Sequence, residues 1–468
     1  MLRLIPVFLL IIFFLSPALA FPTTSQTLQQ LWDIPTDSVR SETIRSYVSD
    51  SVQVEEVYIN SRAYQGKPVK IFGYYSYPRQ STAPLPAILL VHGGGGTASF
   101  QRAVAWARRG YAVLSIDLPG KGENRSGSRS TGPDMFVSNL LNIGPNLEEN
   151  YLVHAVAAAR NAITFLTQRK EVDKERIGMV GLSWGGVITL LTNGQDDRLK
   201  TAVNIFGAGY IPEGCTWQDQ FAAMGEEERF FWYSSIDPKN FFPSQHAPIL
   251  FITGTNDHCY YLPAFQKSYA EIPVPKKLYL VPNLKHRFLP DTQRVVFRWL
   301  DNQLKTRASF PEIELASINI KEDSKIVIST RISSSSQISA VKLLYAPGPP
   351  RGWTSKEWKE IPAFQDEGSY YAAIPISMLQ PEVLFYLTAY DRDGGGASTP
   401  VRSLFKLILP SQKEVCALSS PIHRINFHQT PLIFLGENNL PRSPQIYYSK
   451  EKNAYYLINY SEDVKFKL

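Results

Sequence analysis

The chain has few cysteines, and its candidate metal ligands are dispersed. Three cysteines occur among 468 residues, at Cys215, Cys259 and Cys416, and seven histidines are scattered along the sequence. Because no two cysteines are close in sequence, the ligand spacing of a zinc site is missing, and we expect no bound metal. The odd count leaves two states open for an exported chain: one disulfide, with Cys215 and Cys259 as the preferred pair, or three free thiols.

Concentrated positive charge is also missing. The formal net charge is +6, from 48 Lys and Arg residues against 42 Asp and Glu residues, and no long basic run occurs in the sequence. Since a surface that binds nucleic acid needs a basic patch or stripe, we expect no nucleic-acid partner.

Long apolar runs are absent after the first twenty residues. Those twenty combine Arg3, an apolar stretch at 4–15 and the small-residue sequence Ala18-Leu19-Ala20. This pattern is typical of a secretory signal peptide, whereas an uncleaved membrane anchor needs a longer apolar span. We therefore expect a signal peptide at 1–20, a secreted or periplasmic mature chain, and no stable membrane insertion after cleavage.

Short apolar runs alternate with helical patterns in the region that follows. This order predicts an α/β catalytic domain at 21–306, with a mostly parallel central sheet covered by helices. Helices are expected at 153–166 and 294–304, where apolar residues recur at three- and four-residue steps. Strands are expected at 52–59, 69–77, 87–91, 111–117, 177–182, 202–206, 249–253 and 278–281.

The alternation fails at about 208–247, a segment rich in aromatic residues. We interpret this segment as a cap inserted over the carboxyl edge of the sheet, where open α/β sheets bind ligands. Trp217 and Trp232 are its candidate substrate contacts. For any single one of these aromatic residues, packing of the cap onto the body of the domain is the favoured explanation.

A different pattern begins at about residue 312. Apolar residues alternate with polar ones over short stretches that are separated by turn sequences, which predicts a fibronectin-like β-sandwich at 312–409. Trp353 and Trp358 within it are expected to be exposed, and a structural or interface use of each is favoured over stacking on sugars. The remaining segment, 410–468, has no clear period and no assigned role, although it can add strands or pack on the catalytic domain.

Ser183 is the candidate nucleophile. It lies in Gly-Leu-Ser-Trp-Gly-Gly at 181–186, directly after an apolar run and before a helical stretch. A sharp turn from strand to helix exposes the serine hydroxyl and leaves no room for side chains at Gly181 and Gly185, which is the nucleophile elbow of α/β-hydrolases. An ordinary glycine-serine turn without catalytic function can have the same sequence. The neighbouring motifs must therefore distinguish a nucleophile elbow from such a turn.

The expected partners of Ser183 follow in the chain order of this fold, acid and then base. Asp257 follows the strand expected at 249–253, and His286 follows the last strand. The imidazole of His286 would accept the serine proton, and the carboxylate of Asp257 would orient that imidazole. His258 is a weaker candidate base, because it adjoins Asp257 and precedes the last strand.

Backbone N–H donors for an oxyanion are expected in the loop 92–96, His-Gly-Gly-Gly-Gly, which follows the strand at 87–91. The donors should be Gly94 and Trp184. His92 is expected to brace the loop by hydrogen bonding. Binding of a phosphate is not expected, because no Gly-Lys-Ser/Thr sequence follows and no Gly-x-Gly-x-x-Gly pattern with an acidic partner is completed.

These motifs resemble a known group of enzymes. The segments 90–98, 177–186, 196–198 and 254–257 are similar to the bacterial acetylxylan esterase and dienelactone hydrolase-like branch of the α/β-hydrolases, over roughly residues 50–306. The resemblance implies a serine nucleophile, an aspartate and a histidine at Ser183, Asp257 and His286. It also implies small acyl groups on polysaccharides as substrates.

Together the residues and the resemblance predict a secreted serine carboxylester hydrolase that acts on a small-molecule or polysaccharide ester. It would remove small acyl groups, chiefly acetyl, from carbohydrate through an acyl-enzyme and without a cofactor. The first alternative is a serine peptidase of the prolyl-oligopeptidase kind, although no repeat region of propeller length precedes the first strand. The second is a carbohydrate-binding protein with a vestigial hydrolase domain. The oligomeric state stays open.

Overall fold

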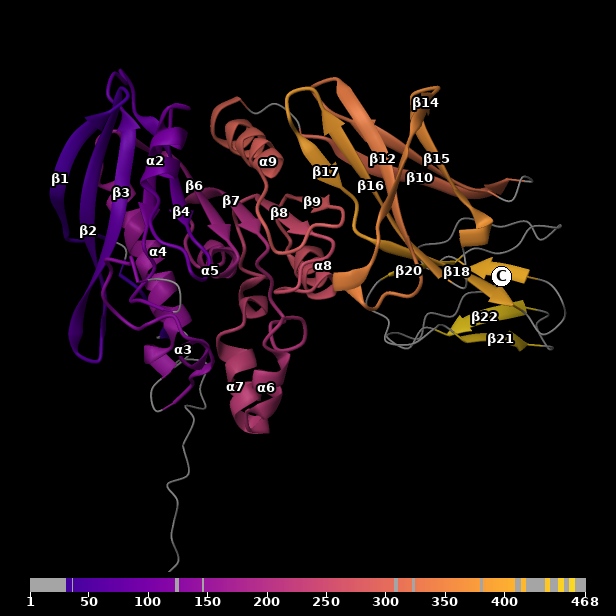
Figure 1. Ribbon diagram of the computed structural model, residues 1–468, viewed down its shortest axis with the longest axis horizontal. Coiled ribbons are helices and arrows are strands. Elements are labelled where there is room, and N and C mark those ends of the chain that lie inside the picture. Colours follow the sequence, from indigo (N-terminus) through magenta and orange to yellow (C-terminus); the bar gives the residue numbers. More distant parts are fainter. Residues whose placement is uncertain are drawn as a thin grey trace, which may run out of the picture.

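The computed structural model describes residues 31–408 except 36, 123–125, 145–146, 307–309, 322–324 and 379–381, together with four strands between 414 and 458. The expected signal peptide at 1–20 lies outside the described residues. An α/β domain and a β-rich domain lie side by side (Figure 1). Within the described parts of the chain, no helix combines the length and the apolar character that crossing a membrane requires.

The α/β domain is built on one sheet, which has nine strands among the described residues, in the order β1-β2-β3-β5-β4-β6-β7-β8-β9. From β5 to β9 in this order the strands are parallel, and β1 to β3 form an antiparallel edge. The predicted fold class is therefore confirmed. The strands are β1 (Ser41–Ser49), β2 (Val52–Tyr64), β3 (Lys67–Pro78), β4 (Leu85–Val91), β5 (Ala112–Ile116), β6 (Val172–Leu182), β7 (Leu199–Ile205), β8 (Ile249–Gly254) and β9 (Lys276–Val281).

Strand β1 was not expected from the sequence. Its residues are mostly exposed at the edge of the sheet, so no apolar alternation marks it. The central strands, in contrast, are marked by apolar runs in the sequence. In β4, Leu89 packs on one face of the sheet and Leu90 on the other, and a strand that is buried on both faces has a nearly continuous apolar sequence.

Helices cover both faces of this sheet. Apolar residues of α4, α5 and α8 share one core with the sheet, and those of α2 and α9 share a second core on the opposite face. Between β7 and β8 the chain forms α6, α7 and the short helix η2, which is the segment interpreted as a cap. The helices are α2 (Phe100–Ala107), α3 (Val137–Leu141), α4 (Tyr151–Thr167), α5 (Trp184–Asn193), α6 (Gln218–Ala223), α7 (Glu226–Ser235), η2 (Pro238–Phe241), α8 (Leu262–Glu271) and α9 (Pro290–Asp301).

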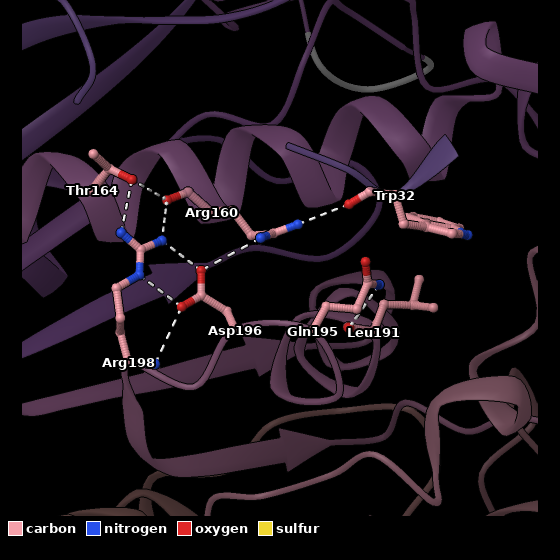
Figure 2. A network of polar contacts seen from close by, with 7 residues as sticks. All are labelled: Trp32, Arg160, Thr164, Leu191, Gln195, Asp196 and Arg198. Carbon is pink, nitrogen blue, oxygen red and sulfur yellow. Dashed lines mark hydrogen bonds and ion pairs between the residues drawn. The ribbon is translucent and has the colours of Figure 1, made fainter. Parts of the chain in front are cut away.

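The Asp-Asp-Arg motif at 196–198 is part of an ionic network that lies against α4 (Figure 2). The carboxylate of Asp196 accepts from the guanidinium of Arg198 and pairs with Arg160 of α4 at 3.5 Å. Arg198 also donates to Thr164 Oγ1 at 2.9 Å. Arg160 donates to the backbone carbonyl of Trp32 at 2.9 Å. This motif therefore joins the segment before β7 to α4, and its role is structural.

The second domain consists of two antiparallel sheets packed face to face. One has the order β10-β11-β15-β14, and the other has the order β13-β12-β16-β18-β19 with β17 and β20 beside them. Ile326, Ile328 and Ile374 of the first sheet share a core with Leu343 and Phe385 of the second. The predicted all-β second domain is confirmed. Its elements are β10 (Glu312–Lys321), β11 (Lys325–Ser333), β12 (Ile338–Pro347), η4 (Trp353–Ser355), β13 (Lys359–Pro362), β14 (Phe364–Asp366), β15 (Ser369–Pro375), β16 (Glu382–Asp391), β17 (Gly396–Ser398) and β18 (Arg402–Ile408).

The C-terminal segment after residue 409 contributes strands to this domain. Strands β19 (Glu414–Ala417) and β20 (Phe434–Glu437) both pair with β18. Strands β21 (Gln445–Ser449) and β22 (Ala454–Ile458) form a separate antiparallel pair.

One sheet of the second domain packs directly on the α/β domain. Residues of β12 and β16 alternate between two cores: Leu343 and Phe385 face the sandwich interior, whereas Leu344 and Tyr386 belong to the core shared with the α/β domain. Trp353 and Trp358 are buried in the same shared core. Figure 1 shows these strands beside β8, β9 and α8. The expected structural or interface use of the two tryptophans is therefore confirmed, whereas their expected exposure is wrong because the interface between the domains buries them.

Candidate active site

Ser183 lies at the turn between β6 and α5. Its backbone has φ 58° and ψ −118°, a conformation that a non-glycine residue adopts only under strain. The N–H of Ser183 donates to the carbonyl of Ile205 at 2.7 Å, which fixes this turn to β7. A Cβ atom on Gly181 would lie 1.9 Å from the carbonyl oxygen of Gly185, and one on Gly185 would lie 2.4 Å from that of Val91. The predicted need for glycine at both positions is confirmed.

The loops after β8 and β9 bring Asp257 and His286 to Ser183. His286 Nε2 is 2.8 Å from Ser183 Oγ, and His286 Nδ1 is 2.8 Å from Asp257 Oδ2. The carboxylate is completely buried, whereas the side chain of His286 is 17 % exposed and Ser183 is partly exposed. The three residues predicted from chain order thus form one hydrogen-bonded row whose serine end solvent can reach.

The surroundings of Asp257 fix the proton positions in this row. Oδ1 accepts from the backbone N–H of Cys259 at 2.7 Å and of Tyr260 at 3.0 Å. Oδ2 is left as an acceptor for the Nδ1–H of His286, so that in the neutral imidazole Nε2 is the unprotonated nitrogen and faces the serine hydroxyl. This is the tautomer that a general base requires.

The charge balance at His286 favours its protonated form. Burial alone would lower the pKa of the imidazole, but the hydrogen bond to Asp257, the nearby Cys259 thiol and the negative charge of Asp257 outweigh burial and raise the pKa to about 9. The imidazolium that forms when His286 accepts a proton is thereby stabilised.

The alternative histidines lie outside the row. The exposed side chain of His258 has its ring centroid 6.1 Å from that of His286. His92 braces the glycine loop as predicted: the backbone N–H of Leu118 donates to Nε2 at 2.9 Å, and Nδ1 lies 2.7 Å from the carbonyl oxygen of Gly93. The structure therefore leaves His286 as the candidate base.

The glycine loop approaches the nucleophile closely. A Cβ atom on Gly93 would lie 2.9 Å from the Cβ of Ser183, and one on Gly94 would lie 3.3 Å from Cδ1 of Trp184. Trp184 is the first residue of α5, where a backbone N–H has no partner within the helix. The structure thus places the two predicted oxyanion donors, Gly94 and Trp184, next to each other beside Ser183.

The two tryptophans predicted as substrate contacts differ in position. Trp217 is partly buried and packs on Trp184, with ring centroids 4.9 Å apart, so it borders the site. The prediction for Trp232 is wrong. Its side chain is completely buried against Phe221, and its indole N–H donates to the carbonyl of Leu140 at 2.9 Å. Trp232 therefore holds the cap segment to the body of the domain.

The preferred disulfide is not formed: Cys215 and Cys259 are both free thiols. Cys215 pairs with Tyr260 in an antiparallel bridge. The Cys259 sulfur lies near the imidazole of His286. Cys416 lies where the structure describes no side chains.

Several residues at the site were missed in the sequence. Phe206, which has a φ of 71°, packs its ring with the centroid 4.7 Å from that of His286. The buried ring of Tyr260 also packs near the imidazole of His286. Cys259, Asp257 and His286 present potential ligand atoms within 4.8 Å of one another. A soft cation could use this set only in competition with the hydrogen bonds of the row. Cysteine spacing could not reveal it, because its members come from two loops.

Two family models match the α/β domain. Residues 26–208 match the model of the acetyl xylan esterase family, and residues 149–305 match that of the prolyl oligopeptidase family. The overlap of the two matches, 149–208, contains Ser183 and its elbow. Asp257 and His286 lie in the part matched by the second model.

Related proteins are similar over the same region. A putative hydrolase, YtaP, of Bacillus subtilis is 26 % identical over 196 residues, which cover 38 % of this chain and 62 % of that protein. The acetyl esterase Axe7A of Xylanibacter ruminicola is 23 % identical over 249 residues, 50 % of this chain and 56 % of that one. The chain thus spans less than two thirds of the length of either relative.

A solved structure shows the same fold. The acetyl xylan esterase from Paenibacillus sp. R4 superimposes with a TM-score of 0.50 at 21 % identity, and the match covers 60 % of this chain and 93 % of that one.

Proposed function

We propose that this chain, which has the α/β-hydrolase fold and matches the acetyl xylan esterase family model over residues 26–208, is a serine carboxylester hydrolase. The observation that carries the proposal is the row from Ser183 Oγ through His286 to Asp257, with both contacts at 2.8 Å. A serine hydroxyl is a weak nucleophile near neutral pH, and an oriented imidazole base makes it reactive.

Acylation would begin when Ser183 Oγ attacks the ester carbonyl carbon and its proton passes to His286 Nε2. The carbonyl oxygen becomes an oxyanion, which the N–H groups of Gly94 and Trp184 stabilise. A single donor of this kind contributes about 10²–10³-fold to the rate. Collapse of the tetrahedral species breaks the bond to the alcohol oxygen, which takes the proton from His286.

Deacylation would repeat these steps with water. His286 Nε2 takes a proton as the water oxygen attacks the acyl carbon, and the same proton returns to Ser183 Oγ when the acid leaves. Asp257 stays ionised throughout and stabilises the imidazolium. No step requires a metal or an organic cofactor.

We assign a small acyl group on carbohydrate as the substrate class. The space beside Gly94 is bordered by the indole of Trp184 and the thioether of Met135, which would lie 3.3 Å and 4.0 Å from a Cβ on that residue. Bulky side chains next to the oxyanion position favour a short acyl chain. Trp217 offers a partly exposed aromatic surface for the alcohol portion. The acetyl esterase relatives support the same class.

We also propose that the mature chain acts outside the cytoplasm. The sequence at 1–20, with Arg3, an apolar core and Ala18-Leu19-Ala20, supports export. Sequencing of the N-terminus of protein recovered from periplasm or medium should begin at Phe21.

The test combines a covalent probe with a substrate panel. A fluorophosphonate should label the wild-type protein and not Ser183→Ala, and that substitution should lower kcat by about 10⁴-fold or more. Among p-nitrophenyl esters, acetate should exceed butyrate in kcat/KM, and acetylated xylan should release acetate. Equal labelling of Ser183→Ala would exclude the serine mechanism, and a preference for butyrate would exclude the short acyl group.

A peptidase is the second candidate, because residues 149–305 match the prolyl oligopeptidase family model. Labelling by the fluorophosphonate does not separate it from an esterase, since both would use the same row. Peptides with an internal proline should remain uncut under conditions in which acetyl esters are hydrolysed. Cleavage after proline, with slower turnover of acetyl esters, would replace the esterase assignment.

A further inference from the structure

The loops that carry Asp257 and His286 are hydrogen-bonded to each other. Asn256 donates its backbone N–H to the carbonyl of Leu284 at 3.0 Å, and Asn283 donates its own to Thr255 Oγ1 at 2.8 Å. Thr255 Oγ1 in turn donates to Asn256 Oδ1 at 2.7 Å. The two loops are therefore joined by hydrogen bonds, so that a contact that holds either loop bears on the positions of both Asp257 and His286.

A segment of the second domain, residues 353–358, holds this unit from outside. Asn256 Nδ2 donates to the carbonyl oxygens of Lys356 at 2.7 Å and Thr354 at 3.4 Å. Asn283 makes a two-way pair with the backbone of Trp358: its Nδ2 donates to the carbonyl at 2.8 Å, and its Oδ1 accepts the N–H at 2.7 Å. Asn256 directly precedes Asp257, and Asn283 lies three residues before His286.

The 353–358 segment is itself rigidly anchored. Trp353 and Trp358 are buried at its two ends, and the ring of Trp358 packs edge-on against Tyr386 of β16 at 5.1 Å. Asn283 has a φ of 58°, a left-handed conformation that asparagine tolerates better than most residues. Its side chain is thereby turned out of the α/β domain towards Trp358.

We propose that the β-sandwich positions the acid–base pair of the active site through Asn256 and Asn283. We call the hydrogen bonds of Asn256 and Asn283 to the 353–358 segment the clamp. The clamp is a contact between the two domains, and the inference rests on the proposed function only for the catalytic roles of Asp257 and His286. Asn256 and Asn283 are positioning residues that do not touch the substrate. Their bonds fix the distance and angle between Asp257 and His286, and a misplacement of about 1 Å at such a pair costs about 10²-fold in rate.

The experiment compares variants of the full-length chain. Asn283→Gly combined with Asn256→Ala removes the clamp, and glycine keeps the positive φ accessible. Asn283→Asp keeps the acceptor for the Trp358 N–H. Gln266→Ala is the matched control, because Gln266 Oε1 accepts the N–H of Val401 across the same domain interface at 2.5 Å but lies on α8, away from both loops.

Three measurements separate positioning from stability. We expect the double variant to lower kcat on p-nitrophenyl acetate by about 10²-fold, with KM within about threefold, and to slow phosphonylation of Ser183 in parallel. The pKa of His286, followed by NMR, should fall, because the contact with Asp257 that raises it loosens. Asn283→Asp should lose less of kcat than the double variant does, and Gln266→Ala should leave kcat, KM, the phosphonylation rate and the pKa of His286 unchanged.

The outcomes distinguish the two proposals. An unchanged His286 pKa and an unchanged phosphonylation rate in the folded double variant would overturn the clamp, and so would an equal loss in Gln266→Ala. A wild-type protein that reacts with the phosphonate but hydrolyses no ester would overturn the esterase assignment alone. The NMR and phosphonylation comparisons would still test whether the clamp positions Asp257 and His286.

Discussion

The proposed nucleophile and the proposed acid–base pair of this site are held by different parts of the molecule. Ser183 is fixed from within the α/β sheet, by glycines that allow β6, α5 and the 92–96 loop to approach each other within van der Waals contact. Asp257 and His286 are carried on loops that are held to each other and to the 353–358 segment of the second domain. One half is therefore built within the α/β domain, whereas the other half depends on a segment of the second domain about 100 residues further along the chain.

This difference shows how a hydrolase domain can acquire a dependence on its neighbour. The central strands that hold the elbow are buried on both faces, so its geometry is set once the domain folds. Strands β8 and β9 lie at one end of the sheet. The second domain packs at this end and supplies partners for the loops.

The largest effect should follow a change on the acid–base side. Asp257→Asn should lower kcat by about 10⁴-fold. The amide oxygen would accept the N–H groups of Cys259 and Tyr260, and the NH₂ would face His286 Nδ1. The imidazole would then carry its proton on Nε2, where it can no longer accept one from Ser183.

Steady-state kinetics on p-nitrophenyl acetate measures this loss. Asp237→Asn is the matched control, because Asp237 is equally buried but accepts backbone N–H groups within the cap segment. It should lower the unfolding temperature and leave kcat unchanged. Retention of a tenth of wild-type activity by Asp257→Asn would mean that Asp257 does not orient the base.

A smaller loss is expected on the nucleophile side. Gly93→Ala would place a Cβ 2.8 Å from the carbonyl oxygen of Leu182 and 2.9 Å from Ser183 Cβ. The loop must shift and carry Gly94 away from the oxyanion, which should lower kcat by about 10²-fold. Gly144→Ala, where a Cβ meets nothing within 4 Å, serves as the control. Equal activity of the two variants would show that the 92–96 loop does not hold the oxyanion.

The smallest effect is a shift in pH dependence. His286 acts as a base only when it is neutral, so kcat/KM should rise with pH through the pKa of this residue in the free enzyme, which lies above its usual value. The Cys259 thiol contributes to that raised pKa. Cys259→Ala should therefore move the acid limb of the profile to lower pH, with kcat at high pH within about threefold of wild type.

Cys215→Ala is the control for this shift, because Cys215 lies on the neighbouring segment, paired with Tyr260, and does not contribute to the raised pKa of His286. Its pH profile should match that of the wild type. A profile for Cys259→Ala that does not move, or that moves to higher pH, would mean that the thiol does not act on His286.

Much of the architecture could be predicted from the sequence because its signals are local. Apolar runs marked the buried strands, and glycines at 181 and 185 marked a turn too tight for side chains. The exposed edge strand β1 gave no such signal. Aromatic residues in the cap segment were read as one group, but burial separates them: Trp217 borders the site, whereas Trp232 is enclosed.

The sequence by itself determined the elbow at Ser183 and the chain order of Asp257 and His286, because steric limits on a turn and the order of strands are properties of a short stretch. Only the tertiary structure decided which way Cys259 points and what holds Asn256 and Asn283. The physical reason is that these asparagines bind backbone N–H and C=O groups of the 353–358 segment. Every residue carries such groups, so a contact made through them leaves no mark in the sequence.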